Sequence, residues 1–280
     1  MKAEQRWQDA AGQRWADLAE RTDAQLGPLG RAAMARLDPA PGERVLDIGC
    51  GAGQSTIELA ERVGATGKVV GLDISEPLLA AARQRIEARS VTNVELVLDN
   101  AATAHFAEPF DLAFSRFGVM FFEDPLAAFA NIGRALRAGG RLGFVCWQRL
   151  EDNPWAAAPL AAVRTLAPER PLGPMLEPGQ PGPFFLSSPA FVSDLLGRAG
   201  FSEVEVVPQE VRLPLGGARS VEEAVDYLLQ IGPASRFLTD AELTLHPRVH
   251  ELLAHAVAPF LDGEGVMVAS RVLLVAARRP

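Results

Sequence analysis

The chain has 280 residues, of which 48% are hydrophobic and 22% are charged. This composition is typical of a folded globular protein and excludes a disordered or collagen-like chain. The formal net charge of −8 argues against nucleic acid as a main partner. The apolar runs are far shorter than the roughly 18 residues that a membrane helix needs, so we expect no membrane partner.

Cysteine content and the N-terminal residues predict the compartment. The two cysteines, Cys50 and Cys146, are too few for a disulfide framework. The first residues lead into no apolar stretch of the kind that secretory signals contain. We therefore expect a cytoplasmic protein.

The first half of the chain alternates strand and helix signals. The predicted strands lie at 44–48, 68–72, 94–98, 110–115 and 141–147. One helix is predicted over 55–63, and Ser75 caps a second helix. A third is predicted to run from Asp124 to the glycines at 139–140. This alternation predicts a parallel sheet with right-handed crossovers.

The second half has a different rhythm. Seven prolines within residues 168–189 predict a long loop. Helices are predicted from Ser188 to about residue 200, from Ser220 to about residue 230, and from Thr239 toward residue 260. Strands are predicted at 204–213 and 271–277, and we expect this pair to complete one edge of the sheet.

A glycine-rich turn follows the first predicted strand directly. The pattern D-x-G-x-G-x-G occupies 47–53 and precedes a predicted helix, so its backbone can approach a ligand closely. A dinucleotide-binding turn would need glycine at position 54, which is Gln54, and Asp47 would repel a pyrophosphate. A cationic ligand tolerates that acid. Asp73 ends the second strand, where a carboxylate can bind ribose hydroxyls. A ribose with a positive group and no phosphate describes S-adenosylmethionine.

Four segments carry a resemblance to a known family. They are ERVLDIGCGAGQST (43–56), VVGLDIS (69–75), FDLAFSRFGVMFFEDP (110–125) and LRAGGRLGFVCW (136–147). Together they resemble the class I S-adenosylmethionine-dependent methyltransferases, most clearly over residues 30–150. The resemblance implies an α/β, doubly wound, mostly parallel seven-stranded Rossmann-like sheet with an antiparallel C-terminal strand. It also implies transfer of a methyl group to a small-molecule acceptor.

The resemblance further implies which residues hold S-adenosylmethionine. The expected cofactor-binding residues are Asp47, Gly49, Cys50, Gly51, Gly53, Asp73, Ile74, Asp99, Asn100, Ala101 and Ser115. The glycine loop would line the methionine part, Asp73 would bind the ribose, and Ile74 would pack on adenine. Either Asp99 or Asn100 would accept a hydrogen bond from the adenine amino group, and we favour Asn100.

Candidates for the acceptor side are fewer. We expect Trp15, Phe117, Trp147 and Tyr227 to contact the acceptor, although Trp15 and Tyr227 also suit ordinary packing. His105 and Arg116 are the candidate catalytic residues. The apolar content of the C-terminal half favours an apolar or aromatic acceptor.

We expect one domain over 1–280. Its predicted parts are an N-terminal helical cap (1–29), a cofactor-binding core (30–149), two lid insertions that set acceptor specificity (150–187 and 214–262), and two segments that complete the sheet (188–213 and 263–280). Oligomeric state is open.

The histidine spacing and the glycine turn also bear on other functions. His250 and His255 are five apart, a spacing that places them on different sides of a helix, so we expect no metal site. Two alternatives stay open from sequence: a catalytically silent protein that binds the same cofactor, and an NAD(P)-dependent oxidoreductase.

Overall fold

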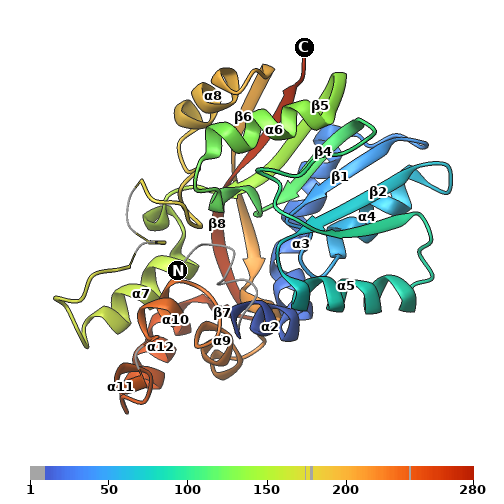
Figure 1. The fold of residues 1–280 in the computed structure, drawn as a ribbon. Helices are drawn as coiled ribbons and strands as arrows, with labels where there is room; N and C mark the ends of the chain where they lie inside the picture. Colours follow the sequence, from blue (N-terminus) through green and yellow to red (C-terminus); the bar gives the residue numbers. More distant parts are fainter. Residues whose placement is uncertain (1–9, 174, 177–178, 240) are drawn as a thin grey trace.

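The computed structural model describes residues 10–280 except 174, 177–178 and 240. Its centre is a sheet with the strand order β3-β2-β1-β4-β5-β8-β6 (Figure 1). The strands are β1 (Arg44–Ile48), β2 (Lys68–Asp73), β3 (Val94–Leu98), β4 (Phe110–Arg116), β5 (Leu136–Trp147), β6 (Ser202–Pro214), β7 (Leu261–Asp262) and β8 (Gly265–Arg278). Strands β1 to β5 pair in parallel, whereas β8 is antiparallel to both of its neighbours, β5 and β6. The predicted fold class is confirmed.

Helices cover both faces of this sheet (Figure 1). They are α2 (Ala10–Asp17), α3 (Ala19–Leu37), α4 (Gln54–Val63), α5 (Glu76–Ala88), α6 (Pro125–Ala135), α7 (Pro154–Arg164), α8 (Pro189–Arg198), α9 (Val221–Leu228), α10 (Pro233–Phe237), α11 (Ala241–Thr244) and α12 (Val249–Val257). Single 3₁₀ turns occur at Val119–Phe121, Leu150–Asp152, Leu215–Gly217 and Ala258–Phe260. Helices α3 and α4 pack together on one face, and α6 packs with α8 on the other.

Side-chain caps fix where several helices begin. Ser75 Oγ accepts a hydrogen bond from the backbone N–H of Leu78, and Asp124 Oδ1 accepts one from that of Ala127. Ser220 caps α9 in the same way. Each cap satisfies a backbone donor that has no partner within the helix. The predicted starts of α5, α6 and α9 are confirmed.

Two predicted helix extents were wrong. Helix α6 ends at Ala135, because Leu136 is fully buried and pairs with Phe110 in the sheet instead of continuing the helix. The helix predicted from Thr239 toward residue 260 is split into α11 and α12, and the break contains Pro247, which has no backbone N–H to donate. Residue 240 of its predicted cap lies outside the described residues.

The segments outside the core of the sheet gather at one end of the molecule. Helices α7, α9, α10 and α12 cluster there, below the sheet in Figure 1. Helix α2 lies beside α5 at the same end. The predicted border of the N-terminal cap, between residues 29 and 30, falls inside α3, and residues 1–9 of that cap lie outside the described residues. Within the described part of the chain, no helix has the length and apolarity to cross a membrane.

Candidate functional site

The glycine-rich turn connects β1 to α4 through three glycines with positive φ angles. These angles are 65° at Gly49, 55° at Gly51 and 82° at Gly53, a region that favours glycine. A Cβ on Gly49 would lie 2.9 Å from the Cα of Gly118, and one on Gly53 would lie 3.0 Å from the Cβ of Ala82. A Cβ on Gly51 would meet no protein atom within 4 Å. Gly49 and Gly53 thus permit close packing, whereas Gly51 faces open space.

Asp73, at the end of β2, holds this turn in place. Its Oδ2 accepts a hydrogen bond of 2.8 Å from the N–H of Gly51, and its Oδ1 accepts one of 2.9 Å from the N–H of Ser75. Burial raises the pKa of Asp73, while the backbone donors oppose that rise. The carboxylate of Asp73 thus connects the glycine turn to Ser75, the residue that caps α5.

Asp47 lies beneath the turn and is fully buried. Ser55 Oγ and Thr56 Oγ1 each donate a hydrogen bond of 2.7 Å to its Oδ2. Its Oδ1 has no hydrogen-bond partner among the described residues. Burial raises the pKa of Asp47 to about 6. Ser115 ties the turn to the neighbouring strand, because its Oγ donates to the carbonyl of Ile48 over 2.8 Å.

A cavity of about 500 Å³ opens at the carboxyl ends of β1, β2, β4 and β5. Its lining includes these predicted site residues: Trp15, Gly49, Cys50, Gly51, Asp73, Ile74, Asp99, Asn100, Ala101, Arg116, Phe117 and Trp147. Their side chains or backbones come from six separate segments of the chain. A volume of this size suits a small-molecule ligand. The roles of the individual residues remain predictions.

Five predicted site residues do not line this cavity: Asp47, Gly53, Ser115, His105 and Tyr227. Gly53 belongs to the glycine turn itself, and Asp47 and Ser115 lie behind that turn, as described above. His105 is exposed on the loop between β3 and β4. Tyr227 is buried against Gly216, where Arg21 lies over its ring at 4.9 Å from the centroid.

The adenine-side candidates lie together after β3. Asn100 Oδ1 accepts a hydrogen bond of 2.9 Å from the N–H of Ala102, and Asp99 Oδ1 accepts one of 2.7 Å from the N–H of Asn100. Both residues line the cavity, so the choice between them stays a prediction. Cys50 is buried, and burial raises the pKa of its thiol well above its usual value, which makes it an unsuitable nucleophile.

Aromatic side chains form one wall of the cavity. The rings of Phe117 and Trp147 stack with their centroids 4.5 Å apart, and those of Trp147 and Trp155 are 4.9 Å apart. Phe184 extends the row, 6.4 Å from Trp155. Phe117 has a φ angle of 60°, a conformation that costs energy for a bulky residue and that often accompanies a functional site.

The N-terminal helices form another wall. The residues of α2 and α3 that line the cavity are Trp15, Ala19, Thr22, Asp23 and Leu26. Their spacing of three or four residues places them on one helical face. This spacing is visible in the sequence and is a signal for a helical face that lines the site. Of these residues, only Trp15 was predicted from the sequence to lie at the site. Trp155 and Arg236, which also line the cavity, carry no comparable signal.

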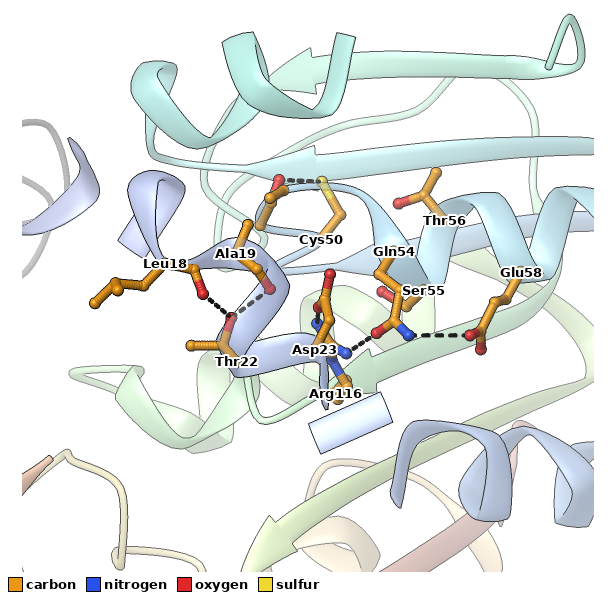
Figure 2. A network of polar contacts seen from close by, with 12 residues as sticks. Leu18, Ala19, Thr22, Asp23, Cys50, Gln54, Ser55, Thr56, Glu58 and Arg116 are labelled. Carbon is orange, nitrogen blue, oxygen red and sulfur yellow. Dashed lines mark hydrogen bonds and ion pairs between the residues drawn. The ribbon is translucent and has the colours of Figure 1, made fainter. Parts of the chain in front are cut away.

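A network of polar side chains joins α3 to the glycine turn (Figure 2). Arg116 Nη2 lies 2.9 Å from Asp23 Oδ1, and Arg116 Nη1 donates to Gln54 Oε1. Gln54 in turn donates to Glu58 over 3.1 Å. Arg85, on α5, pairs with the other oxygen of Asp23 at 2.7 Å. Asp23 therefore connects three elements that are far apart in sequence.

Fold and site together define a methyltransferase of the class I type. Residues 45–140 match the family model described as a methyltransferase domain. The chain belongs to the S-adenosylmethionine-dependent methyltransferases that act on small molecules.

Two curated relatives and one solved structure illustrate this membership. The chain is 33% identical to nocamycin O-methyltransferase of Saccharothrix syringae over 250 residues, which cover 82% of this chain and 84% of that protein. It is 39% identical to aklanonic acid methyltransferase of Streptomyces sp. (strain C5) over 118 residues, which cover 42% of this chain and 54% of that protein. The fold resembles that of phosphoethanolamine N-methyltransferase 2 from Haemonchus contortus, with a TM-score of 0.56 and 20% identity over 90% of this chain and 52% of that one.

The cavity fits the cofactor of this family. Gly51 leaves open space where a ligand can approach the backbone, and the Asp73 carboxylate lies beside it. The acidic residues of the lining are Asp23, Asp73, Asp99, Glu123 and Asp124, whereas its basic residues are Arg116 and Arg236. An excess of carboxylates suits the sulfonium charge of S-adenosylmethionine.

Proposed function

We propose that this chain methylates an oxygen atom of a planar, largely apolar small molecule. The aromatic wall of the cavity carries this proposal: the rings of Phe117 and Trp147 stack, Trp155 packs at an angle beside them, and such a wall favours a ligand with a flat face. The names of the two curated relatives support it further: one is an O-methyltransferase for nocamycin, and the other acts on aklanonic acid.

The residues of the chain would act mainly by placing the reactants. Bound S-adenosylmethionine supplies a methyl group that its sulfonium already activates. Phe117 and Trp147 would hold the acceptor near that group, and the face of α2 and α3 would exclude water. Among the described residues that line the cavity, none is His, Lys or Tyr. We therefore propose that the acceptor is acidic enough to react without a His, Lys or Tyr base, and that His105 takes no part.

The location belongs to the same proposal. Cys50 and Cys146 are both free and buried. Unpaired cysteines suit a reducing compartment, and this supports a cytoplasmic enzyme.

An acceptor panel tests the function. The protein is incubated with S-adenosylmethionine and with hydroxyanthraquinones, hydroxynaphthoquinones or aliphatic alcohols of similar size, and S-adenosylhomocysteine and the methylated product are measured. We expect turnover with planar hydroxylated acceptors and none with the alcohols. The variant Trp147→Ala should raise the KM for the acceptor about 10-fold, since aromatic contacts contribute about 0.5–1.5 kcal/mol beyond their buried area.

Phe191→Ala is the matched control. Phe191 also contacts another aromatic ring, that of Phe185, but it lies outside the cavity and is 38% exposed. Its KM should equal that of the wild type. Turnover of aliphatic acceptors alone, or a Trp147→Ala variant with unchanged KM, would contradict the proposal.

A further inference from the structure

Arg116 is a cation in the wall of a cavity that must accept a cationic ligand. It is the last residue of β4, and its side chain is only 13% exposed. A buried guanidinium next to a sulfonium opposes binding unless it faces an anionic part of the ligand. S-adenosylmethionine has one anionic group, the carboxylate of its methionine portion.

The position of Arg116 matches that end of the ligand. Its Nη1 donates to Gln54, the residue that follows the glycine turn directly. Arg85, which shares Asp23 with Arg116, donates to the carbonyl of Ala52 within the turn over 3.0 Å. The other arginine of the lining, Arg236, lies on α10 and donates to Met175 Sδ, in the insertion. Of the two arginines that line the cavity, Arg116 is therefore the one that lies beside the glycine turn.

The guanidinium is also held in one orientation. Asp23 Oδ1 fixes Nη2 from the side of α3, and Gln54 fixes Nη1 from the side of α4 (Figure 2). The aliphatic part of Arg116 packs against α3, because a Cβ on Gly30 would lie 3.0 Å from its Cδ. A guanidinium fixed in this way can offer its remaining N–H groups to a carboxylate in a defined geometry.

We propose that Arg116 binds the carboxylate of the cofactor and that Asp23 is the positioning residue that aims it. This inference rests on the use of S-adenosylmethionine by this chain, and it assigns Arg116 to cofactor binding instead of to methyl transfer. It also gives the N-terminal helix α3 a part in cofactor recognition through a single side chain.

Calorimetry with two ligands tests the assignment. S-adenosylhomocysteine carries the carboxylate, whereas S-adenosyl-3-thiopropylamine keeps the adenosine, the sulfur and the ammonium group but lacks it. Arg116→Met should weaken binding of S-adenosylhomocysteine about 10- to 100-fold, the range for a hydrogen bond to a charged group. Binding of the decarboxylated ligand should change less than twofold. Arg116→Lys, which keeps the charge but loses the planar fork, should fall in between.

Arg31→Met is the matched control. Arg31 pairs with Glu58 at the outer end of the same network, is 49% exposed and does not line the cavity. It should bind both ligands as the wild type does. Equal loss of both ligands in Arg116→Met, or S-adenosylhomocysteine affinity within twofold of wild type, would overturn the assignment. If Arg116→Met fails to fold, Arg116→Lys decides by the same comparison of the two ligands. A wild-type protein that binds neither ligand would instead refute the cofactor itself.

Discussion

Replacing Asp73 tests two roles of this carboxylate, its predicted role in cofactor binding and its role in holding the glycine turn. The sequence predicts that Asp73 binds the ribose, so Asp73→Ala should weaken cofactor binding. The structure adds an effect on stability, because the N–H groups of Gly51 and Ser75 both donate to this side chain. Asp73→Ala removes the acceptor of each.

The size of the effect follows from these two contacts. A hydrogen bond to a charged group contributes about 1.5–3 kcal/mol, so two set an upper bound of about 6 kcal/mol. Two factors reduce this figure. Water from the cavity can reach the N–H of Gly51, and burial of the carboxylate, which raises its pKa, already costs part of the gain. We expect Asp73→Ala to lower the free energy of unfolding by about 2–4 kcal/mol. Asp73→Asn keeps one oxygen acceptor and should lose about half as much.

Urea unfolding and calorimetry on the same proteins provide the measurement. Wild-type protein should be stabilised by S-adenosylhomocysteine and not by NAD, since a ligand that binds only the folded state raises its stability. Asp73→Ala should bind S-adenosylhomocysteine about 10- to 100-fold more weakly. An unfolding free energy within about 0.5 kcal/mol of wild type would refute the structural role. Cofactor affinity within a factor of two would refute the ligand role.

Three further variants separate backbone geometry and buried charge from ligand contact. Gly51→Val should abolish binding of S-adenosylhomocysteine, because its side chain would enter the open space of the cavity. Gly64→Val, which also has a positive φ (66°) but lies outside the cavity, should lose stability and keep binding. Equal binding by both variants would count against the role of Gly51. The pKa of Asp47 is raised from 3.8 to about 6, so its contribution to stability is most favourable below pH 3.8 and is lost as the pH rises toward 6. At 1.36 kcal/mol per pKa unit, Asp47→Asn should remove about 3 kcal/mol of pH dependence between those limits, and parallel stability curves for variant and wild type would contradict this.

Short-range patterns predicted that the glycine turn and Asp73 lie at one edge of the sheet. The glycine turn and Asp73 each follow a buried strand directly, and parallel strands bring their carboxyl ends to one edge of the sheet. Local sequence therefore sufficed to place them near each other. The sequence did not predict that Asp47 and Ser115 support the turn from behind. Strand alternation alone does not reveal which side of a turn a side chain occupies.

The rest of the site depends on contacts between distant segments. The ion pairs of Asp23 with Arg85 and Arg116 form only because α3, α5 and β4 pack together. No local sequence pattern predicts this packing. For Tyr227 the sequence left acceptor contact and ordinary packing open. The ring packs against Gly216 and does not line the cavity. A sequence without aligned relatives gives no sign of which face of such an inserted helix turns toward the ligand.

The position of β8 affects how the protein is made. It follows every other strand in the sequence, yet it lies between β5 and β6, pairing with β6 along most of its length and with β5 over Val272–Arg278. During synthesis on the ribosome, β5 and β6 therefore emerge before the strand that pairs with both of them. Unpaired strand edges are prone to aggregation and to pairing with the wrong strand. The helices between β6 and β8 must leave the ribosome before the gap can close. Because Trp147 pairs with Val272 of β8, the strand that carries Trp147 gains its second neighbour in the sheet only at this last step.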